Sequence, residues 1–353
     1  MVNEQYIVGV ETGYDTIIVG AGLCGLIVAR ELVAAGRRVV VLDKGRGVGG
    51  RMSTRRTGGA AFDHGAQFIT ARSSRFAVEV QRWADAGVAA LWSRGFADGR
   101  TGDGSLVTAT PHGGEPHTPA RDGHPRYRGV PSMSAIPKYL AHGIDIRLAV
   151  TITAIGRGPN GRWVATASDG TRYDAETAVV TAPVPQAIDM LDAGGVEIAP
   201  FARSELASLA YEPCLAVLTV LETQIDLPVP GVLRRPHPSV AWIADNQQKG
   251  VSPAGPALTV HCSPDFSVRH YDDEDELIVA RVLAALEGLS LRPRFCEVKR
   301  WRYSRPSAPL TVGAWATGIP DGLVLAGDAF AGARVEGAAL SGFAAAAALC
   351  HQA

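Results

Sequence analysis

The chain has 353 residues, of which 46% are hydrophobic and 20% charged, and its formal net charge is −1. A chain of this length can bury a large core, and its balanced charge argues against a protein built to grip nucleic acid or an anionic membrane surface. The five cysteines form no CxxC pair, and no apolar run reaches the ~18 residues of a membrane span. The first residues do not read as a secretory signal. We therefore expect a cytoplasmic protein with free thiols and no metal, nucleic acid or membrane partner.

The first elements in the chain predict a βαβ unit. Residues 16–20 read as a buried parallel strand, 26–36 as a helix and 37–43 as the next buried strand. A Gly-X-Gly-X-X-Gly motif, Gly20 to Gly25, lies between the first strand and the helix. Its first glycine permits a tight turn, Gly22 lets a pyrophosphate approach the backbone, and Gly25 lets the helix pack closely on the strand. Asp43 ends the second strand, where a carboxylate accepts hydrogen bonds from ribose hydroxyls. These features predict a dinucleotide site.

The rest of the chain alternates between helical and strand patterns. We predict a helix over 75–92, turns and short strands over 93–130, a loop entering a helix over 129–143, a β-meander over 144–183, strands within 200–262, a helix over 272–289, a strand over 296–306, a buried strand over 322–330 and a final helix. The fold class is α/β: a Rossmann-type domain (residues 14–75, 144–190 and 307–353) with an inserted antiparallel-sheet substrate domain (residues 76–143 and 191–306).

Two further motifs narrow the identity of the dinucleotide. Gly49-Gly50-Arg51-Met52 follows Asp43 closely, and Gly327-Asp328 ends an apolar strand before the last helix. In flavoproteins with two dinucleotide-binding domains, an arginine after such a glycine pair supports the FAD phosphates. A Gly-Asp after an apolar strand binds the ribityl chain in the same class, and the following helix points its N-terminus at the flavin. Asp43 also disfavours the 2′-phosphate of NADP. The three motifs together indicate bound FAD.

Seven segments carry a resemblance to renalase and its bacterial relatives, which are FAD enzymes of the wider amine-oxidase-like group. The segments are residues 45–56, 62–70, 129–141, 242–250, 261–267, 301–306 and 327–346. The resemblance implies non-covalent FAD in a fold like that of p-hydroxybenzoate hydroxylase. It also implies oxidation of 1,2- and 1,6-dihydro isomers of NAD(P), with O₂ reduced to hydrogen peroxide.

The motifs and the resemblance together define candidate cofactor contacts. These are Gly20, Gly22, Cys24, Gly25, Asp43, Lys44, Gly50, Arg51, Met52, Gln67, Phe68, Asp328, Gly337 and Ala338. The chain has Phe68 where the family often has tyrosine and Phe266 where it often has tryptophan. These two differences put the identity of the substrate in question more than the identity of the cofactor.

Hydride transfer from a dihydropyridine needs little acid–base help, so we expect residues that orient the substrate. The candidate catalytic residues are His64, Gln67, Trp242 and His261, and the candidate substrate-binding residues are Phe68, Thr70, Arg72, Asn246, Trp301 and Tyr303. Each also has a structural interpretation: a core histidine, a surface glutamine, a solvated arginine, or strand aromatics in a core. Lys299 resembles the flavin-facing lysine of some amine oxidases, but an exposed basic strand with Arg300 is the simpler interpretation.

Several functions fit these residues. The first is a renalase-like dihydropyridine oxidase acting on a small molecule with O₂, as a monomer or weak homodimer. The second is an FAD oxidase or dehydrogenase for an amine, imine or cyclic dihydro compound. A flavin-bound protein without turnover is the third, and nucleic-acid binding through residues 44–56 is the fourth.

Overall fold

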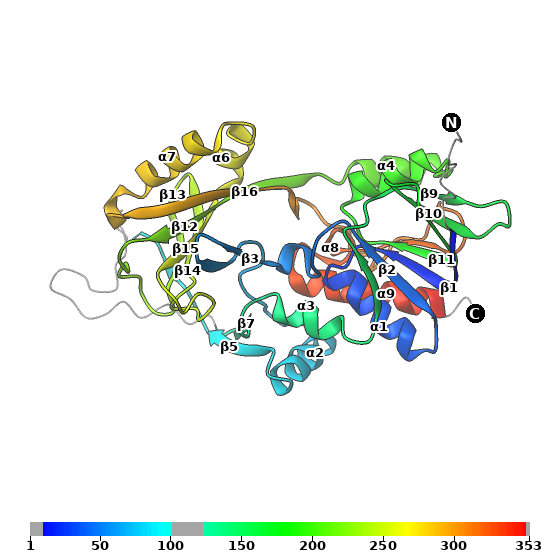
Figure 1. Ribbon diagram of the computed structural model, residues 1–353, viewed down its shortest axis with the longest axis horizontal. Helices are drawn as coiled ribbons and strands as arrows, with labels where there is room; N and C mark the ends of the chain where they lie inside the picture. Colours follow the sequence, from blue (N-terminus) through cyan, green and yellow to red (C-terminus); the bar gives the residue numbers. More distant parts are fainter. Residues whose placement is uncertain (1–9, 101–122, 351–353) are drawn as a thin grey trace, which may run out of the picture. The chain divides into compact units, whose positions relative to one another are not determined.

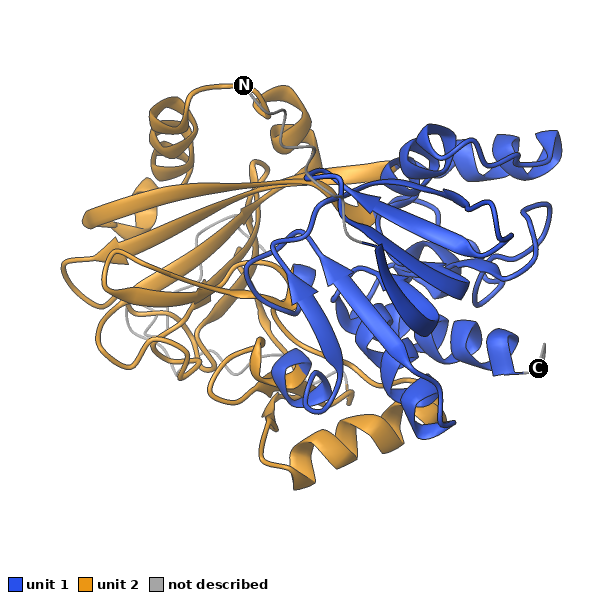
Figure 2. Cartoon of the chain, turned by 45° about the vertical axis from the view of Figure 1, so that its right-hand side comes forward, with its two compact units in different colours: residues 1–50, 137–210, 306–353 blue, residues 51–136, 211–305 orange. Residues whose placement is uncertain are grey.

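The computed structural model describes residues 10–100 and 123–350. The chain divides into two compact units (Figure 2): unit 1 comprises residues 1–50, 137–210 and 306–353, and unit 2 comprises residues 51–136 and 211–305. Residues 51–75, expected in the FAD-binding domain, lie in unit 2. Residues 137–143 and 191–210, expected in the substrate domain, lie in unit 1. Which unit binds FAD and which binds the substrate stays a prediction.

Unit 1 is built on a seven-stranded sheet with the order β8-β2-β1-β11-β10-β9, in which β17 pairs with β11. Its strands are β1 (Val10–Val19), β2 (Val39–Asp43), β8 (Asp145–Leu148), β9 (Ile152–Arg157), β10 (Trp163–Ala167), β11 (Arg172–Val180) and β17 (Leu323–Leu325). Strands β1, β2, β8, β11 and β17 pair in parallel, and β9 and β10 extend the sheet antiparallel to β11. The predicted strand–helix–strand unit at the start of the chain is confirmed.

The helices of unit 1 lie against this sheet (Figure 1). They are α1 (Leu23–Ala34), α4 (Val184–Ala193), α5 (Pro200–Ala207), α8 (Asp328–Ala331) and α9 (Val335–Cys350), and α3 (Ala135–Leu140) begins at the end of a unit 2 segment. Helices α1 and α9 pack side by side. Their backbones approach closely at Gly342, where a Cβ atom would lie 2.8 Å from the carbonyl oxygen of Cys24. The small residues of α9 thus allow the last helix to support the helix of the glycine motif.

Unit 2 is built on a six-stranded sheet with the order β16-β12-β15-β14-β13-β6, accompanied by the two-stranded sheets β3-β4 and β5-β7. Its strands are β3 (Thr54–Thr57), β4 (Ala60–Asp63), β5 (Ala89–Ser93), β6 (Ala97–Asp98), β7 (Arg126–Gly129), β12 (Tyr211–Leu221), β13 (Val232–His237), β14 (Val240–Asp245), β15 (Ala257–Cys262) and β16 (Pro293–Pro306). Its helices are α2 (Ser74–Asp85), α6 (Pro264–Arg269) and α7 (Asp275–Ala285), and the short 3₁₀ helices η1 (Gly50–Met52) and η2 (Glu287–Leu289) complete the elements.

The main core of unit 2 lies between its large sheet and helices α6 and α7. Leu215 and Val260 of the sheet pack with Phe266 of α6 and with Ile278 and Val282 of α7. Phe266, one of the two positions at which this chain differs from the family it resembles, is therefore a core residue in this unit.

Three expectations about elements are wrong. The helix expected over 75–92 ends at Asp85, because Gly87 adopts a left-handed conformation (φ +71°) and residues 89–93 form β5. The meander expected over 144–183 includes only β9 to β11, since β8 pairs in parallel with β2 at the other edge. The region 200–262 contains its expected strands, as β12 to β15, but it begins with helix α5, which its alternating pattern did not indicate.

The described ranges contain neither a membrane-spanning helix nor a cluster of metal ligands. Within residues 10–100 and 123–350, no helix has the length and apolar character needed to cross a membrane. In the same part of the chain, no three histidine, cysteine or acidic side chains gather to ligate a metal. All five cysteines are free thiols.

Candidate functional site

The glycine motif in unit 1 forms a tight turn from β1 into α1. Gly20 has a φ of +113°, and a Cβ atom there would overlap the hydroxyl of Thr181. A Cβ atom at Gly25 would overlap the carbonyl oxygen of Gly20, so this glycine permits the helix to approach the strand. Both glycines are therefore required by packing within the protein.

Gly22 differs from its two partners in the motif. It is the N-cap of α1 in an extended conformation, no side chain caps the helix there, and a Cβ atom would meet no described atom within 4 Å. Packing within the protein therefore does not require glycine at this position. The bare helix N-terminus and the accessible backbone suit the pyrophosphate of a dinucleotide, since N–H groups and the helix dipole favour an anion.

Asp43, the last residue of the second strand, is hydrogen-bonded to this turn. Its Oδ2 accepts the N–H of Ala21 at 2.6 Å, and its Oδ1 accepts the N–H of Gly45 at 2.6 Å. Each carboxylate oxygen keeps a lone pair for a further donor such as a ribose hydroxyl. Of the neighbouring candidates, Cys24 is buried in α1, whereas Lys44 and Gly50 are exposed.

The C-terminal candidates of unit 1 lie at the starts of two helices. Asp328 is buried at the first position of α8, and the N–H of the preceding Gly327 donates to Ser341 Oγ of α9 at 2.8 Å. Gly337 lies in the first turn of α9, where a Cβ atom would overlap the carbonyl oxygen of Gly332. The N–H of Ala338 already donates to the carbonyl of Arg334 at 3.0 Å.

The remaining candidates lie in unit 2. Arg51 Nη1 donates to the carbonyl of Ser304 on β16 at 2.9 Å, and the carbonyl of Arg51 accepts the N–H of Ala66 at 2.8 Å. Met52 is buried. A Cβ atom at Gly65 would overlap the backbone of Arg51, so these two segments are in close contact.

His64, His261 and Trp301 come together around one carbonyl group. The imidazole of His64 stacks on the indole of Trp301 with ring centroids 5.1 Å apart and planes 15° from parallel. His261 Nε2 and Trp301 Nε1 each lie 3.1 Å from the carbonyl oxygen of His64 and donate to it. Three predicted site residues from β15, β16 and the end of β4 thus form one cluster.

Both histidines of this cluster are neutral at physiological pH. Burial, followed by repulsion from Lys299 and His261, lowers the pKa of His64 to about 4. Burial also lowers the pKa of His261 to about 4. His64 Nε2 lies 3.2 Å from Ser53 Oγ, while the buried Nδ1 has no hydrogen-bond partner among the described residues. An unsatisfied buried nitrogen of this kind is a place where a ligand gains a hydrogen bond.

Gln67 and Asn246 differ in how far the protein satisfies them. Gln67 Nε2 donates to the carbonyls of Asp63 (2.5 Å) and Gly65 (3.2 Å), but its buried Oε1 has no partner in the described part of the chain. Asn246 uses both ends of its amide: Oδ1 accepts the N–H of Asp63, and Nδ2 donates to Ala257 and Thr259. Gln67 therefore keeps an acceptor for a ligand, whereas Asn246 supports the fold.

Phe68 and Trp242 belong to an aromatic cluster with Trp92 and Phe96. Phe68 lies 5.6 Å from Trp242 and 5.1 Å from Phe96 between ring centroids, and Trp92 lies 5.1 Å from Phe96. The guanidinium of Arg126 lies 5.0 Å from the ring centroid of Phe96. The indole N–H groups of Trp92 and Trp242 are buried without a described acceptor. The cluster therefore combines apolar faces with donors and a cation.

The last three candidates lie elsewhere in unit 2. Tyr303 packs edge-on against Tyr211 at 5.4 Å between ring centroids. Thr70 is half-buried, and Arg72 is exposed just before α2.

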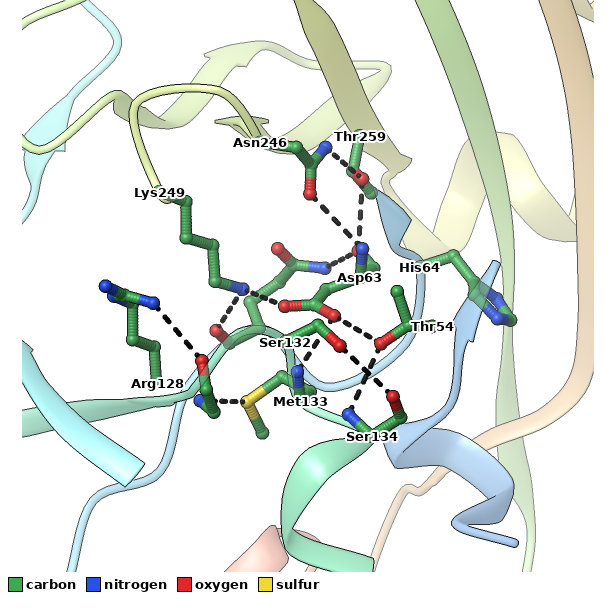
Figure 3. A network of polar contacts seen from close by, with 12 residues as sticks. Thr54, Asp63, His64, Arg128, Ser132, Met133, Ser134, Asn246, Lys249 and Thr259 are labelled. Atoms are coloured by element: carbon green, nitrogen blue, oxygen red, sulfur yellow. Dashed lines mark hydrogen bonds and ion pairs between the residues drawn. The ribbon is translucent and has the colours of Figure 1, made fainter. Parts of the chain in front are cut away.

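Sequence reasoning missed a buried ion pair beside these groups (Figure 3). Lys249 Nζ lies 2.9 Å from Asp63 Oδ2, and neither side chain has any exposed surface. Lys249 follows β14 in a polar turn, Asp245 to Gly250, which reads as solvated surface. Its only sequence signal is its place in the segment 242–250 that carries the resemblance.

Comparison with known proteins gives the family. The chain matches the NAD(P)-binding Rossmann-like domain over residues 18–81 and the flavin containing amine oxidoreductase family over residues 89–350. It is 45% identical to a putrescine oxidase of Kocuria rosea over 69 residues, which are 19% of this chain and 14% of that protein.

Two solved structures share the fold. Wild-type putrescine oxidase bound to putrescine superposes with a TM-score of 0.69 at 15% identity, over 97% of this chain and all of the other. A fatty acid isomerase from P. acnes gives a TM-score of 0.66 at 14% identity, over 96% and 98% of the two chains. Since the family match covers most of the sequence, the chain belongs to the flavin-containing amine oxidoreductase family and is an FAD-dependent oxidoreductase.

Proposed function

We propose that this protein is a renalase-like oxidase that takes a hydride from a dihydropyridine, such as the 1,2- or 1,6-dihydro isomers of NAD(P), and uses O₂ as the electron acceptor. Non-covalent FAD and a topology like that of p-hydroxybenzoate hydroxylase are parts of this proposal. When bound, FAD would supply the hydride acceptor and the route of two electrons to O₂; with one proton taken from solvent, each turnover would give one aromatic NAD(P)⁺ and one hydrogen peroxide.

The observation that carries the proposal is the charge around the aromatic groups of unit 2. Arg126 borders Phe96, and Lys299 Nζ lies 5.3 Å from the ring centroid of Trp301. The buried carboxylate of Asp63 is already engaged by Lys249. Cations beside aromatic faces suit a flat ring that carries phosphates and disfavour a substrate ammonium.

The neutral histidines fit a reaction that needs no base. In a dihydropyridine the nitrogen lone pair drives the hydride away, and no proton has to leave first. His64, with a pKa of about 4, has an unpartnered nitrogen that can hydrogen-bond the substrate without titrating near neutral pH. Gln67 Oε1 offers an acceptor, which suits the N–H₂ group of a carboxamide. In this proposal these residues orient the substrate rather than transfer protons.

Amine oxidation is the second candidate, and family membership favours it. One of the relatives matched by sequence over a short segment is a putrescine oxidase, and the fold is shared with putrescine oxidase. An amine reacts as its free base, so this function predicts activity that rises toward alkaline pH.

Oxygen consumption separates the two functions. Purified enzyme is mixed with each dihydro-NAD isomer, with NADH and with putrescine, and O₂, hydrogen peroxide and NAD⁺ are measured together. The proposal predicts equal amounts of NAD⁺ and hydrogen peroxide from the isomers alone. Turnover of putrescine alone would reject the dihydropyridine assignment in favour of the second candidate.

A further inference from the structure

The segment 63–69 carries three predicted site residues, and its backbone is held from several sides. Thr259 Oγ1 donates to the carbonyl of Asp63 at 3.0 Å, and His261 and Trp301 donate to the carbonyl of His64. At the end of the segment, Ile69 exchanges two backbone hydrogen bonds with Tyr127, each of 2.8 Å. The orientation of the segment is therefore set by side chains and strands around it.

Lys249 adds one hydrogen bond and one ion pair to these contacts. Its ammonium donates to the carbonyl of Gln67 at 2.7 Å and pairs with Asp63 Oδ2 at 2.9 Å (Figure 3). It thus connects the two ends of the run from Asp63 to Gln67. The same ammonium lies 4.8 Å from the ring centroid of Trp92, so it also contacts the aromatic cluster.

Asp63 also accepts hydrogen bonds from residues of other elements. Its Oδ1 accepts the hydroxyl of Thr54 at 2.8 Å and the N–H of Met133 at 3.0 Å. The Thr54 hydroxyl in turn accepts the N–H of Ser134 at 3.3 Å. One carboxylate thereby joins β3, β4 and the residues before α3.

Stability alone does not account for a lysine in this place. Burial lowers the pKa of Lys249, which reflects the cost of removing an ammonium from water. A buried ion pair is often no more stabilising than well-packed apolar residues of similar size. What Lys249 provides in addition is a directional hydrogen bond to the carbonyl of Gln67, which fixes geometry better than apolar contacts do.

We propose that Lys249 is a positioning residue that, through Asp63 and the carbonyl of Gln67, sets the placement of His64, Gln67 and Phe68. The inference rests on the proposed function only in that these three residues face FAD or substrate. The tests below use no substrate, so the inference and the reaction assignment fail independently.

The central test compares Lys249→Met, Asp63→Asn and the double variant as FAD-loaded proteins. Each single change leaves one buried charged partner without its counterpart, and the thermal midpoint falls by about 10 °C. The double variant removes both charges and recovers most of that loss. The matched control is Glu212→Gln with Arg305→Gln, which neutralises an exposed ion pair of the same unit.

The deciding measurement is the NMR titration of His64 in the double variant. Lys299, His261 and Arg55 lower the His64 pKa and the Asp63 charge raises it, so removing that charge alone lowers the pKa further. A displaced, hydrated His64 instead titrates about two pH units higher, toward 6.5. We expect that rise together with about tenfold weaker FAD binding. A recovered midpoint with a His64 pKa at or below about 4, and with FAD affinity within twofold of wild type, would overturn the proposal.

If the double variant does not fold, amide hydrogen exchange in the wild-type holoprotein provides a second test of the proposal. The amides of Ala66 and Ile69, which donate to Arg51 and Tyr127, are expected to exchange at least about 1,000-fold more slowly than in an unfolded chain. Exchange within about tenfold of the unfolded rate would mean that the segment is not held in place, and the proposal would be wrong.

Discussion

The imidazole ring of His64 stacks on the indole of Trp301, with ring centroids 5.1 Å apart. The same indole donates a hydrogen bond from Nε1 to the backbone carbonyl oxygen of His64 at 3.1 Å. The backbone and the side chain of one residue are thus fixed by one partner. His64 is thereby held in a buried, uncharged state, which is the property on which the proposed chemistry depends.

This burial predicts a pH dependence of stability. The unfolded chain protonates each histidine near pH 6.5, whereas folded His64 and His261 have pKa values of about 4. Their contribution is therefore complete above pH 6.5 and is lost as the pH falls toward 4. The free energy of unfolding should fall by about 1.4 kcal/mol per histidine for each pH unit below 6.5. Urea denaturation at pH 7.5 and 5.5 measures this fall, and His64→Gln should halve it. Equal free energies at the two pH values would show that the histidines are not buried neutral.

The glycine motif predicts opposite outcomes for two similar substitutions. Gly25→Ala places a methyl group on the carbonyl oxygen of Gly20 and should destabilise the protein by about 3 kcal/mol. Gly22→Ala meets no described atom within 4 Å at an ordinary φ of −74°, so the fold should tolerate it while FAD binding weakens. Thermal melts of the apoprotein and FAD titrations followed by fluorescence separate the two effects. Normal FAD affinity in Gly22→Ala would contradict a cofactor at this turn.

Arg51 and Arg55 form a second matched pair. Arg51→Ala should weaken FAD binding about 10- to 100-fold, because the proposed phosphate contact is a charge-assisted hydrogen bond. Arg55, whose guanidinium pairs with Glu297 at a partly exposed site, serves as the control, and Arg55→Ala should bind FAD within twofold of wild type. The flavin content of the purified variants is the first measurement. Full occupancy in Arg51→Ala would refute its assignment.

The parts of the fold that were predictable are those encoded by neighbouring residues. The βαβ unit and its glycine motif follow from a contiguous pattern, and Gly25 is required by a contact with Gly20 within that same stretch, whereas the contact that requires Gly20 is with the distant Thr181. The joining of β8 to β2 was not predictable, because pairing between distant strands leaves no local signal.

The candidate site, too, was predictable only in part. Recognisable segments pointed to His64, His261 and Trp301, which contact one another in unit 2. Lys249 and Asp63 were missed because a lysine in a polar turn is usually exposed, and its counter-ion lies far away in the sequence. The aromatic partner Trp92 was missed because the expected helix extended too far, to residue 92, and Phe96 was missed because it lies in a region expected to form turns and short strands.

Anaerobic stopped-flow reduction of the bound flavin tests the central claim most directly. The oxidised holoenzyme is mixed with 1,2-dihydro-NAD, 1,6-dihydro-NAD, NADH or putrescine, and the loss of flavin absorbance is followed in the absence of O₂. The account predicts rapid bleaching by one or both isomers, at least about 100-fold faster than by NADH or putrescine, a difference of about 2.7 kcal/mol in activation free energy. Bleaching by putrescine and not by either isomer would contradict it.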